Sequence, residues 1–462
     1  MLELSSEMEF PEDQYYRLNY ILLSVIGLWP YDNFKVRQFR FFLVTLIVIS
    51  LTAALLMKLF FSENNLGPIL KILSIYANFT LIFAKYITFY AITENVKEFR
   101  KRIRNNWYSL IDNREIEIIR KQANTGKSFT MFILMSVYFS IFFYISTQYF
   151  SILLDMVKPL NETRPRKLIL LTEYFIDQEK YFHIIAIHIS TGVVVVLTIL
   201  IATESFCFAN ALHAFGLFKV ASYRMEHILS EIDPQMCSTE KFIISRDKII
   251  AAVDFHRRAI EFSKLLQATF GPAYLSVFVI GVFSASISLY NMSQILMTED
   301  EVLEIIKYTT MLALPIIYLT VGNFVGQEFI DCDMHFYHTI CSTPWYIAPL
   351  KTQSLILFLI QKTTKSYKVD AGGLFSPSLE GLATVRDLVK INRNVSQLAT
   401  CGTFFVLEFE YDNFLFYGSS LHTIMMSGIK KNTINFLLFW NYVIKVTNNV
   451  INNKIIKLIN II

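Results

Sequence analysis

Six long apolar stretches limit what this chain can fold into more than any other feature of its sequence. A helix needs about 20 mostly apolar residues to cross the roughly 30 Å hydrocarbon core of a bilayer, and each stretch is long enough to do so. We therefore predict an all-α, polytopic membrane protein in one domain. The predicted spans are approximately 41–61, 69–92, 128–153, 182–206, 273–291 and 304–326.

The composition agrees with a lipid environment. Only 17% of the residues are charged, against about 25% in a typical soluble domain, and the mean hydropathy is +0.43. The net charge of +4 is too small to indicate a nucleic-acid partner. Lys71 and Lys85 interrupt the second span, but each lies near enough to an end to extend its ammonium group to the membrane surface.

The distribution of basic residues predicts the orientation. The segment 93–127 carries nine Lys or Arg side chains and is expected in the cytoplasm, whereas the turn before the sixth span is acidic (Glu299, Asp300, Glu301) and is expected outside. Basic residues also precede the first span, so the N-terminus is predicted to be inside. Asn161, in the sequence Asn-Glu-Thr, then lies in an external loop and is a candidate glycosylation site.

Catalytic signatures are missing from the sequence: no P-loop, dinucleotide fingerprint or nucleophile elbow is present. We therefore expect no enzyme activity and no cofactor. Cys332, His335, His338 and Cys341 are spaced by three, but on a helix the outer two are roughly 13.5 Å apart. One tetrahedral zinc ion cannot collect all four, so we expect a structural role at the cytoplasmic surface and no metal, with a two-ligand metal site as the alternative.

Aromatic side chains recur at helical spacing in the second and third spans. This pattern is typical of helix packing, and it also suits an apolar pocket for a small volatile ligand with a few polar groups such as Gln148, His188 and Asn291. Periodicity alone does not decide between the two interpretations.

The C-terminal third resembles an insect odorant receptor, specifically a ligand-tuning subunit rather than the co-receptor. Earlier parts of the chain fit the same pattern, and the resemblance covers about residues 10–385. The residues that carry it are Gly27-Leu28-Trp29-Pro30, His256, Phe262, Phe270, Gly326-Gln327, Pro344-Trp345-Tyr346-Ile347-Ala348-Pro349-Leu350, Gln353, the stretch 355–361, Lys365-Ser366-Tyr367, Gly372-Gly373-Leu374-Phe375 and Ser378-Leu379-Glu380-Gly381.

This resemblance implies a seven-span subunit with its N-terminus inside. It implies a hetero-tetramer with an Orco-type co-receptor around a non-selective cation pore, in the plasma membrane of an olfactory sensory neuron. The intracellular ends of the last helices, including Trp345, would join the subunits, and the pore would be lined by the final helix, here Leu374, Phe375, Leu379, Leu382 and Val385. The odorant would lie in the external halves of the helices, where the candidate contacts are Tyr76, Phe79, Phe142, Tyr149, His188 and Tyr290.

After Val385 the sequence departs from the family pattern. The segment 374–385 gives only about 18 Å of helix, too short for a bilayer, and Arg386, Asp387 and Lys390 follow it. We expect an incomplete last span and an atypical tail over 386–462, whose Asn-, Ile- and Lys-rich end resembles translated noncoding, intron-like sequence.

Two other receptor classes are alternatives. A G-protein-coupled seven-helix receptor would have its N-terminus outside, against which the basic segment 93–127 argues. Gustatory receptors differ from odorant receptors at the end of the last helix, which is altered here, but the pattern from 345 to 381 favours odorant receptors.

Overall fold

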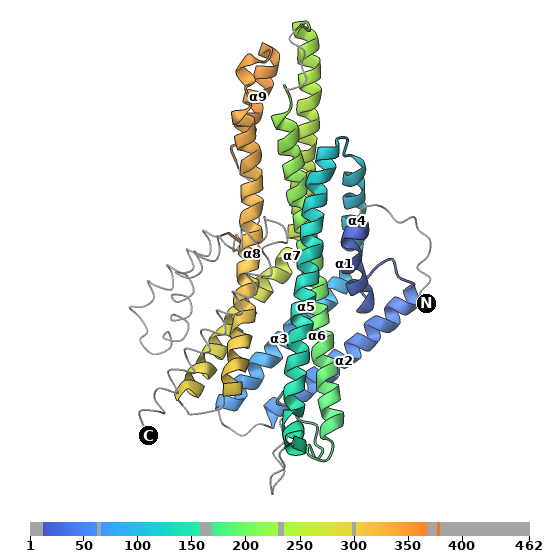
Figure 1. Cartoon of the computed structure of the whole chain (residues 1–462), viewed down its shortest axis with the longest axis vertical. Helices are drawn as coiled ribbons and strands as arrows, with labels where there is room; N and C mark the ends of the chain where they lie inside the picture. Colours follow the sequence, from blue (N-terminus) through green and yellow to red (C-terminus); the bar gives the residue numbers. More distant parts are fainter. Residues whose placement is uncertain are drawn as a thin grey trace. The chain divides into compact units, whose positions relative to one another are not determined.

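The structure is a computed structural model that describes residues 13–61, 66–157, 168, 170–229, 235–297, 302–365, 367 and 377–378. Within these ranges every regular element is helical, which confirms the predicted all-α class. The elements are α1 (Asp13–Val25), α2 (Phe34–Phe60), α3 (Leu66–Ala91), α4 (Thr93–Tyr108), α5 (Asn113–Val157), α6 (Phe182–Glu226), α7 (Ser238–Met297), α8 (Val302–Ser342), the 3-10 helix η1 (Trp345–Ile347) and α9 (Leu350–Thr363) (Figure 1).

The chain divides into two compact units. Among the described residues, the first unit holds 13–61, 79–277 and parts of 322–378, and the second holds 66–78 and parts of 278–321. Helices α3, α7 and α8 each contribute to both units. All contacts discussed below lie within the first unit.

Each of the six predicted spans coincides with a helix or with part of one. Four helical segments among the described residues are long and apolar enough to cross a membrane, namely Phe34–Phe60, Ile69–Ala91, Asn113–Tyr149 and Phe182–Glu226. Helices α6 and α7 also continue well beyond the predicted spans, as the amphipathic sequence between 209 and 270 suggests. The depth of each helix in the bilayer stays a prediction.

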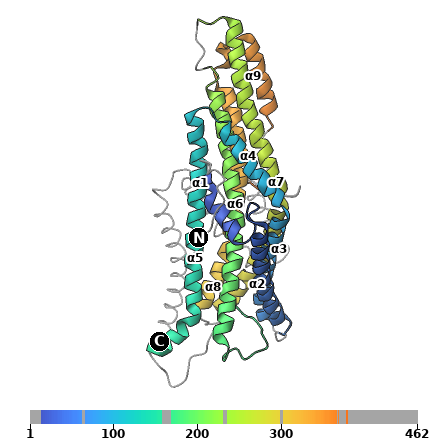
Figure 2. The ribbon, with the colours of Figure 1, turned by 90° about the vertical axis from the view of Figure 1, so that its right-hand side faces the viewer.

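Helix α6 forms the centre of the first unit. Every side chain from 208 to 218 is buried, as expected for a helix that is apolar all round. Figures 1 and 2 show α5 and α6 running alongside one another. Small residues allow this close approach, since a Cβ at Gly126 would meet Leu212 and a Cβ at Gly216 would press on Ile119.

The turn between α1 and α2 requires a glycine. Gly27 has φ +74°, and a Cβ on it would collide with backbone atoms of Arg37 and Phe41. The Leu28 amide donates to the Leu23 carbonyl over 2.8 Å, which closes the end of α1. Helix α2 then begins after Asn33, whose side chain accepts from the Lys35 amide over 3.1 Å.

Candidate functional site

An ion pair between a buried lysine and a partly exposed glutamate joins α3 to α6. The Lys85 ammonium contacts the Glu204 carboxylate, and the Lys85 side chain is only 8% exposed. The expectation that Lys85 extends to the membrane surface was therefore wrong. Within a predicted span an unpaired ammonium is costly, so a carboxylate on the neighbouring helix stabilises it better than a stretched side chain does.

His188, a candidate ligand contact, lies in a hydrogen-bonded cluster between α2, α6 and the loop before α6. Its Nε2 lies 2.9 Å from Ser50 Oγ, and its Nδ1 lies 2.7 Å from the Tyr174 hydroxyl. Burial raises the pKa of Tyr174, which keeps this hydroxyl protonated. Since both ring nitrogens are occupied, a ligand would bind His188 only by displacing one of these partners.

The same loop is attached to α2 at a second point. The Glu173 amide donates to the Ala54 carbonyl over 3.1 Å, and the Glu173 carboxylate pairs with Lys58 at 3.1 Å. Burial opposes ionisation of Glu173, but the hydrogen bonds from Lys58 and from the Phe175 and Tyr174 amides, together with the Lys58 charge, outweigh it and lower the pKa of the carboxyl below 4.5. The loop is thus held on α2 by both its backbone and its charge.

Tyr149 packs where α5 meets the start of α6. Its ring is 6.2 Å from His183 in a stacked arrangement and 6.2 Å from Phe182 edge to face. The neighbouring Gln148 is buried and donates to Ser190 Oγ over 3.1 Å. Aromatic and polar groups therefore do lie side by side in this part of the molecule, as the sequence pattern suggested.

The other candidate ligand contacts are not gathered at this point. Phe142 is 72% exposed and shares an outward stripe of α5 with Phe139 and Phe143, because residues three and four apart lie on one face of a helix. Phe79 belongs to the first unit, whereas Tyr76 and Tyr290 belong to the second. The candidate set stays a prediction.

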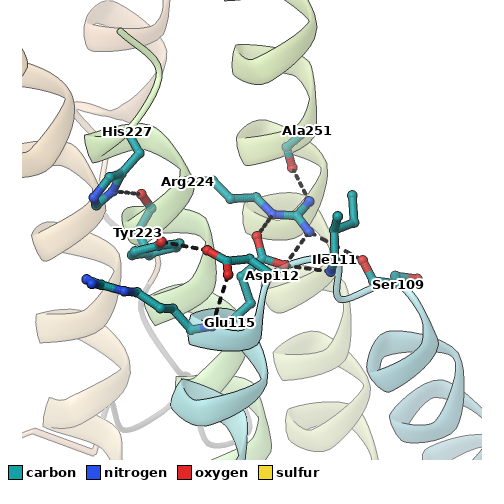
Figure 3. Close-up of polar contacts among 9 residues, drawn as sticks. Ser109, Ile111, Asp112, Glu115, Tyr223, Arg224, His227 and Ala251 are labelled. Atoms are coloured by element: carbon teal, nitrogen blue, oxygen red, sulfur yellow. Dashed lines mark hydrogen bonds and ion pairs between the residues drawn. The ribbon is translucent and has the colours of Figure 1, made fainter. Parts of the chain in front are cut away.

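Figure 3 shows a polar cluster around Arg224, near the end of α6. Its Nε and Nη2 donate to the two carboxylate oxygens of Glu115 over 2.6 and 2.8 Å. Its remaining donors reach the carbonyl oxygens of Ala251 and Ser109, each over 3.3 Å. The two side chains are 11% and 5% exposed, so this bidentate pair joins α5, α6 and α7 in a largely dry environment.

A second carboxylate lies at the edge of this cluster. The Tyr223 hydroxyl donates to Asp112 over 2.7 Å, and this hydrogen bond holds the pKa of Asp112 below its ordinary value. Sequence reasoning missed both pairs. The signal available was the amphipathic pattern of 209–270, which indicates helix but not the partner of each charge.

Trp345 lies in η1, between α8 and α9. Gln353 holds this turn by donating to the carbonyl oxygens of Tyr346 and Ala348 over 3.0 and 2.9 Å, and α9 is joined to α7 by the 2.8 Å contact between Thr352 and Ser245. Large apolar side chains are exposed around it. They are Tyr346, Ile347, Leu350, Leu357 and Phe358, with exposed fractions from 50% to 80%.

Several predicted sites lie outside the described residues: Asn161, Leu374, Phe375, Leu379, Leu382, Val385 and the tail 386–462. Within the part of the chain that the structure describes, no three His, Cys, Asp or Glu side chains converge as a metal site would require. Cys332 instead contacts Glu328 of its own helix at 3.7 Å.

Comparison with known proteins identifies the fold. A sequence model described as 7tm Odorant receptor matches residues 65–389, which confirms the family resemblance. The structure is similar to the insect olfactory receptor OR5 from Machilis hrabei in complex with eugenol, at 15% identity and a TM-score of 0.64, over 85% of this chain and 97% of that chain. A second structure of that receptor gives 15% identity and a TM-score of 0.60, over 83% and 98%. No curated protein sequence matches.

Proposed function

The chain belongs to the 7tm odorant receptor family, and from this premise we propose that it is a ligand-tuning subunit that binds a small volatile odorant. The match over residues 65–389 carries this proposal. The family is of receptor type rather than enzyme type, and the protein is a multi-pass membrane protein. We place it in the plasma membrane of olfactory sensory neurons, with its N-terminus inside.

We further propose that the subunit gates a non-selective cation channel together with an Orco-type co-receptor in a hetero-tetramer. The exposed apolar side chains of η1 and α9 support this assembly, because we expect them in the cytoplasm. An exposed apolar patch on a surface that faces water is typical of a protein–protein interface. Odorant binding would then shift a closed–open equilibrium, since a ligand stabilises the state that binds it better.

The experiment that tests the proposal is odorant-evoked current from cells that express this chain with a co-receptor. Two versions are compared: the chain as written, and one whose residues after Val385 are replaced by an apolar helix. We expect current from the second version only, because Arg386, Asp387 and Lys390 would each cost about 2.5 to 3.5 kcal/mol near a membrane centre. Absence of current from both versions would count against the channel function, and current from the first would show that the tail forms a working span.

Ligand contact is tested by alanine substitution in the conducting version. Truncating an aromatic contact should weaken odorant sensitivity by about 1 to 3 kcal/mol, roughly 5- to 150-fold. We expect the largest effect at Tyr149, which packs internally, and the smallest at Phe142, which is 72% exposed. Unchanged sensitivity at all six positions would refute this site. They are Tyr76, Phe79, Phe142, Tyr149, His188 and Tyr290.

A G-protein-coupled receptor would differ in orientation. A peptide tag on the N-terminus should be inaccessible to antibody in intact cells and accessible after permeabilisation. Labelling of intact cells would overturn the proposed topology.

A further inference from the structure

Asp333 of α8 is a buried carboxylate that the proposed odorant site does not use. It is 7% exposed on its side chain, and its Oδ1 lies 2.8 Å from Nε2 of His256 on α7. Its Oδ2 accepts from the backbone amide of Tyr367 over 2.6 Å. A buried carboxylate is stable only when its oxygens are hydrogen-bonded or paired, and here both oxygens have partners.

The His256 ring is held so that it points at Asp333. It stacks on Phe336 of α8, with centroids 4.1 Å apart and planes 14° apart, and it meets Phe218 of α6 edge to face at 5.5 Å. These two rings leave the imidazole little rotational freedom. The His256–Asp333 contact therefore has a fixed direction, and it orients the carboxylate toward the Tyr367 amide.

Tyr367 is attached at its side chain as well as at its backbone. Its hydroxyl donates to Gln267 Oε1 on α7 over 3.1 Å. Burial raises the pKa of this hydroxyl to about 12, so it stays protonated and able to donate. The ring also packs edge to face on Phe329 of α8, with centroids 6.4 Å apart. Tyr367 follows the end of α9 by only a few residues, so these contacts fix the chain where it leaves α9.

Helix α8 also contacts the described residues Pro377 and Ser378. The Ser378 amide donates to Oδ1 of Asn323, which is buried, over 3.2 Å. Three residues further along α8, a Cβ on Gly326 would collide with the backbone of Pro377, so only glycine permits this contact. The backbone amides of Tyr367 and Ser378 thus both donate hydrogen bonds to polar side chains of α8.

We propose that Asp333, oriented by His256, is a positioning residue that fixes Tyr367 on α8, so that α8 moves as one body with Tyr367 and with Ser378. The hydrogen bond from the Ser378 amide to Asn323 is the second attachment to α8. The contacts in this arrangement come from α6, α7 and α8. Its use in gating rests on the proposed channel function, because only a channel would convert this movement into current.

The test is hydrogen exchange of the full chain, purified in lipid nanodiscs, followed by mass spectrometry. Asp333→Leu is compared with Asp331→Leu, a matched control two residues away that removes the same charge from an exposed position of α8. Losing the acceptor should speed exchange of the Tyr367 amide on the order of tenfold. Exchange at Ser378 should rise as well, because the two attachments act on one body. The control should leave both amides unchanged.

Equal protection of Tyr367 in wild type and Asp333→Leu, or equal loss in the control, would overturn the proposal. If Asp333→Leu does not fold, the wild type is compared with His256→Leu instead. A wild-type Tyr367 amide that exchanges at the rate of an unstructured chain refutes the attachment. Strong protection of this amide in the wild type that falls in His256→Leu supports it.

A second measurement tests the role in gating. In the version whose residues after Val385 are replaced by an apolar helix, expressed with the co-receptor, Asp333→Leu should lower the maximal odorant-evoked current several-fold with little change in the half-maximal odorant concentration. A change in both the maximal current and the half-maximal odorant concentration would assign Asp333 to ligand binding and refute its role in gating. Absence of any current from the tail-replaced version that keeps Asp333 would count against the channel function alone, since the exchange measurement still decides the attachment.

Discussion

Breaking the Arg224–Glu115 pair should destabilise the protein more than any exposed substitution nearby. Arg224 donates to both carboxylate oxygens of Glu115 and to two carbonyl oxygens, and the two side chains are 11% and 5% exposed. Glu115→Gln would leave a guanidinium in a dry site facing a neutral amide. Removing one partner of such a buried pair costs about 3 to 5 kcal/mol, because the remaining charge has lost its compensation.

Replacing both partners should cost much less. In Glu115→Leu/Arg224→Met no charge is left buried, and apolar side chains of similar volume can pack between α5 and α6. The double variant should therefore be closer to wild type than either single variant. Arg114→Gln is the matched control, since this neighbouring side chain is exposed and should change stability by no more than about 0.5 kcal/mol.

The measurement is equilibrium unfolding in mixed detergent micelles, with the fraction folded read from near-ultraviolet circular dichroism. A double-mutant cycle over the wild type, Glu115→Leu, Arg224→Met and the double variant gives the coupling energy of the pair. The reasoning is refuted if Glu115→Gln behaves like Arg114→Gln, or if the double variant loses as much stability as the two single variants together.

Three further outcomes follow from other contacts. Replacing Glu204 by Gln should cost about 3 to 5 kcal/mol in the same unfolding assay, because the buried Lys85 ammonium loses this carboxylate. Replacing Lys85 by Met should cost less, because the Glu204 side chain is 30% exposed, and replacing both should also cost less. Because the pKa of Glu173 is lowered below 4.5, its contribution with Lys58 is fully present above that pH and is lost as the pH falls through the lowered value; Glu173→Gln should abolish this part of the acid sensitivity. Gln353→Ala should speed amide exchange in η1, because two carbonyl oxygens lose their donor, and unchanged exchange would contradict this role.

The helices could be predicted from the sequence because length and apolarity determine them. A span such as 182–206 is predominantly apolar and long enough to cross a bilayer, so it forms a helix in lipid whatever its neighbours are. The continuation of α6 to Glu226 was also visible, since the pattern beyond 209 is amphipathic. The turn at Gly27 was marked by its motif, although the positive φ that requires glycine appeared only in the structure.

The side-chain contacts were much harder to predict because they join residues far apart along the chain. Arg224 and Glu115 are separated by 109 positions, and helical periodicity carries no information over such a distance. Phe142 is a second example of a position that periodicity could not predict. Its spacing fits an internal aromatic row, but the rotation of α5 about its axis directs it outward. Only packing against neighbours sets that rotation, and no neighbour can be identified from one helix.

The Lys85–Glu204 pair could have been predicted from the sequence, by comparing the charges inside the predicted spans. The six predicted spans contain only two acidic side chains, Glu204 and Glu304. In the predicted topology the spans 69–92 and 182–206 both run inward, so Lys85 and Glu204 lie near the intracellular ends of their helices, whereas Glu304 begins its span at the external side. A buried ammonium needs a carboxylate at its own depth, and of the two only Glu204 satisfies that requirement. Treating Lys85 as a single side chain that reaches for water left out this comparison. In a chain with so few charges inside its spans, matching each charge by depth and sign predicts helix contacts that apolar periodicity cannot.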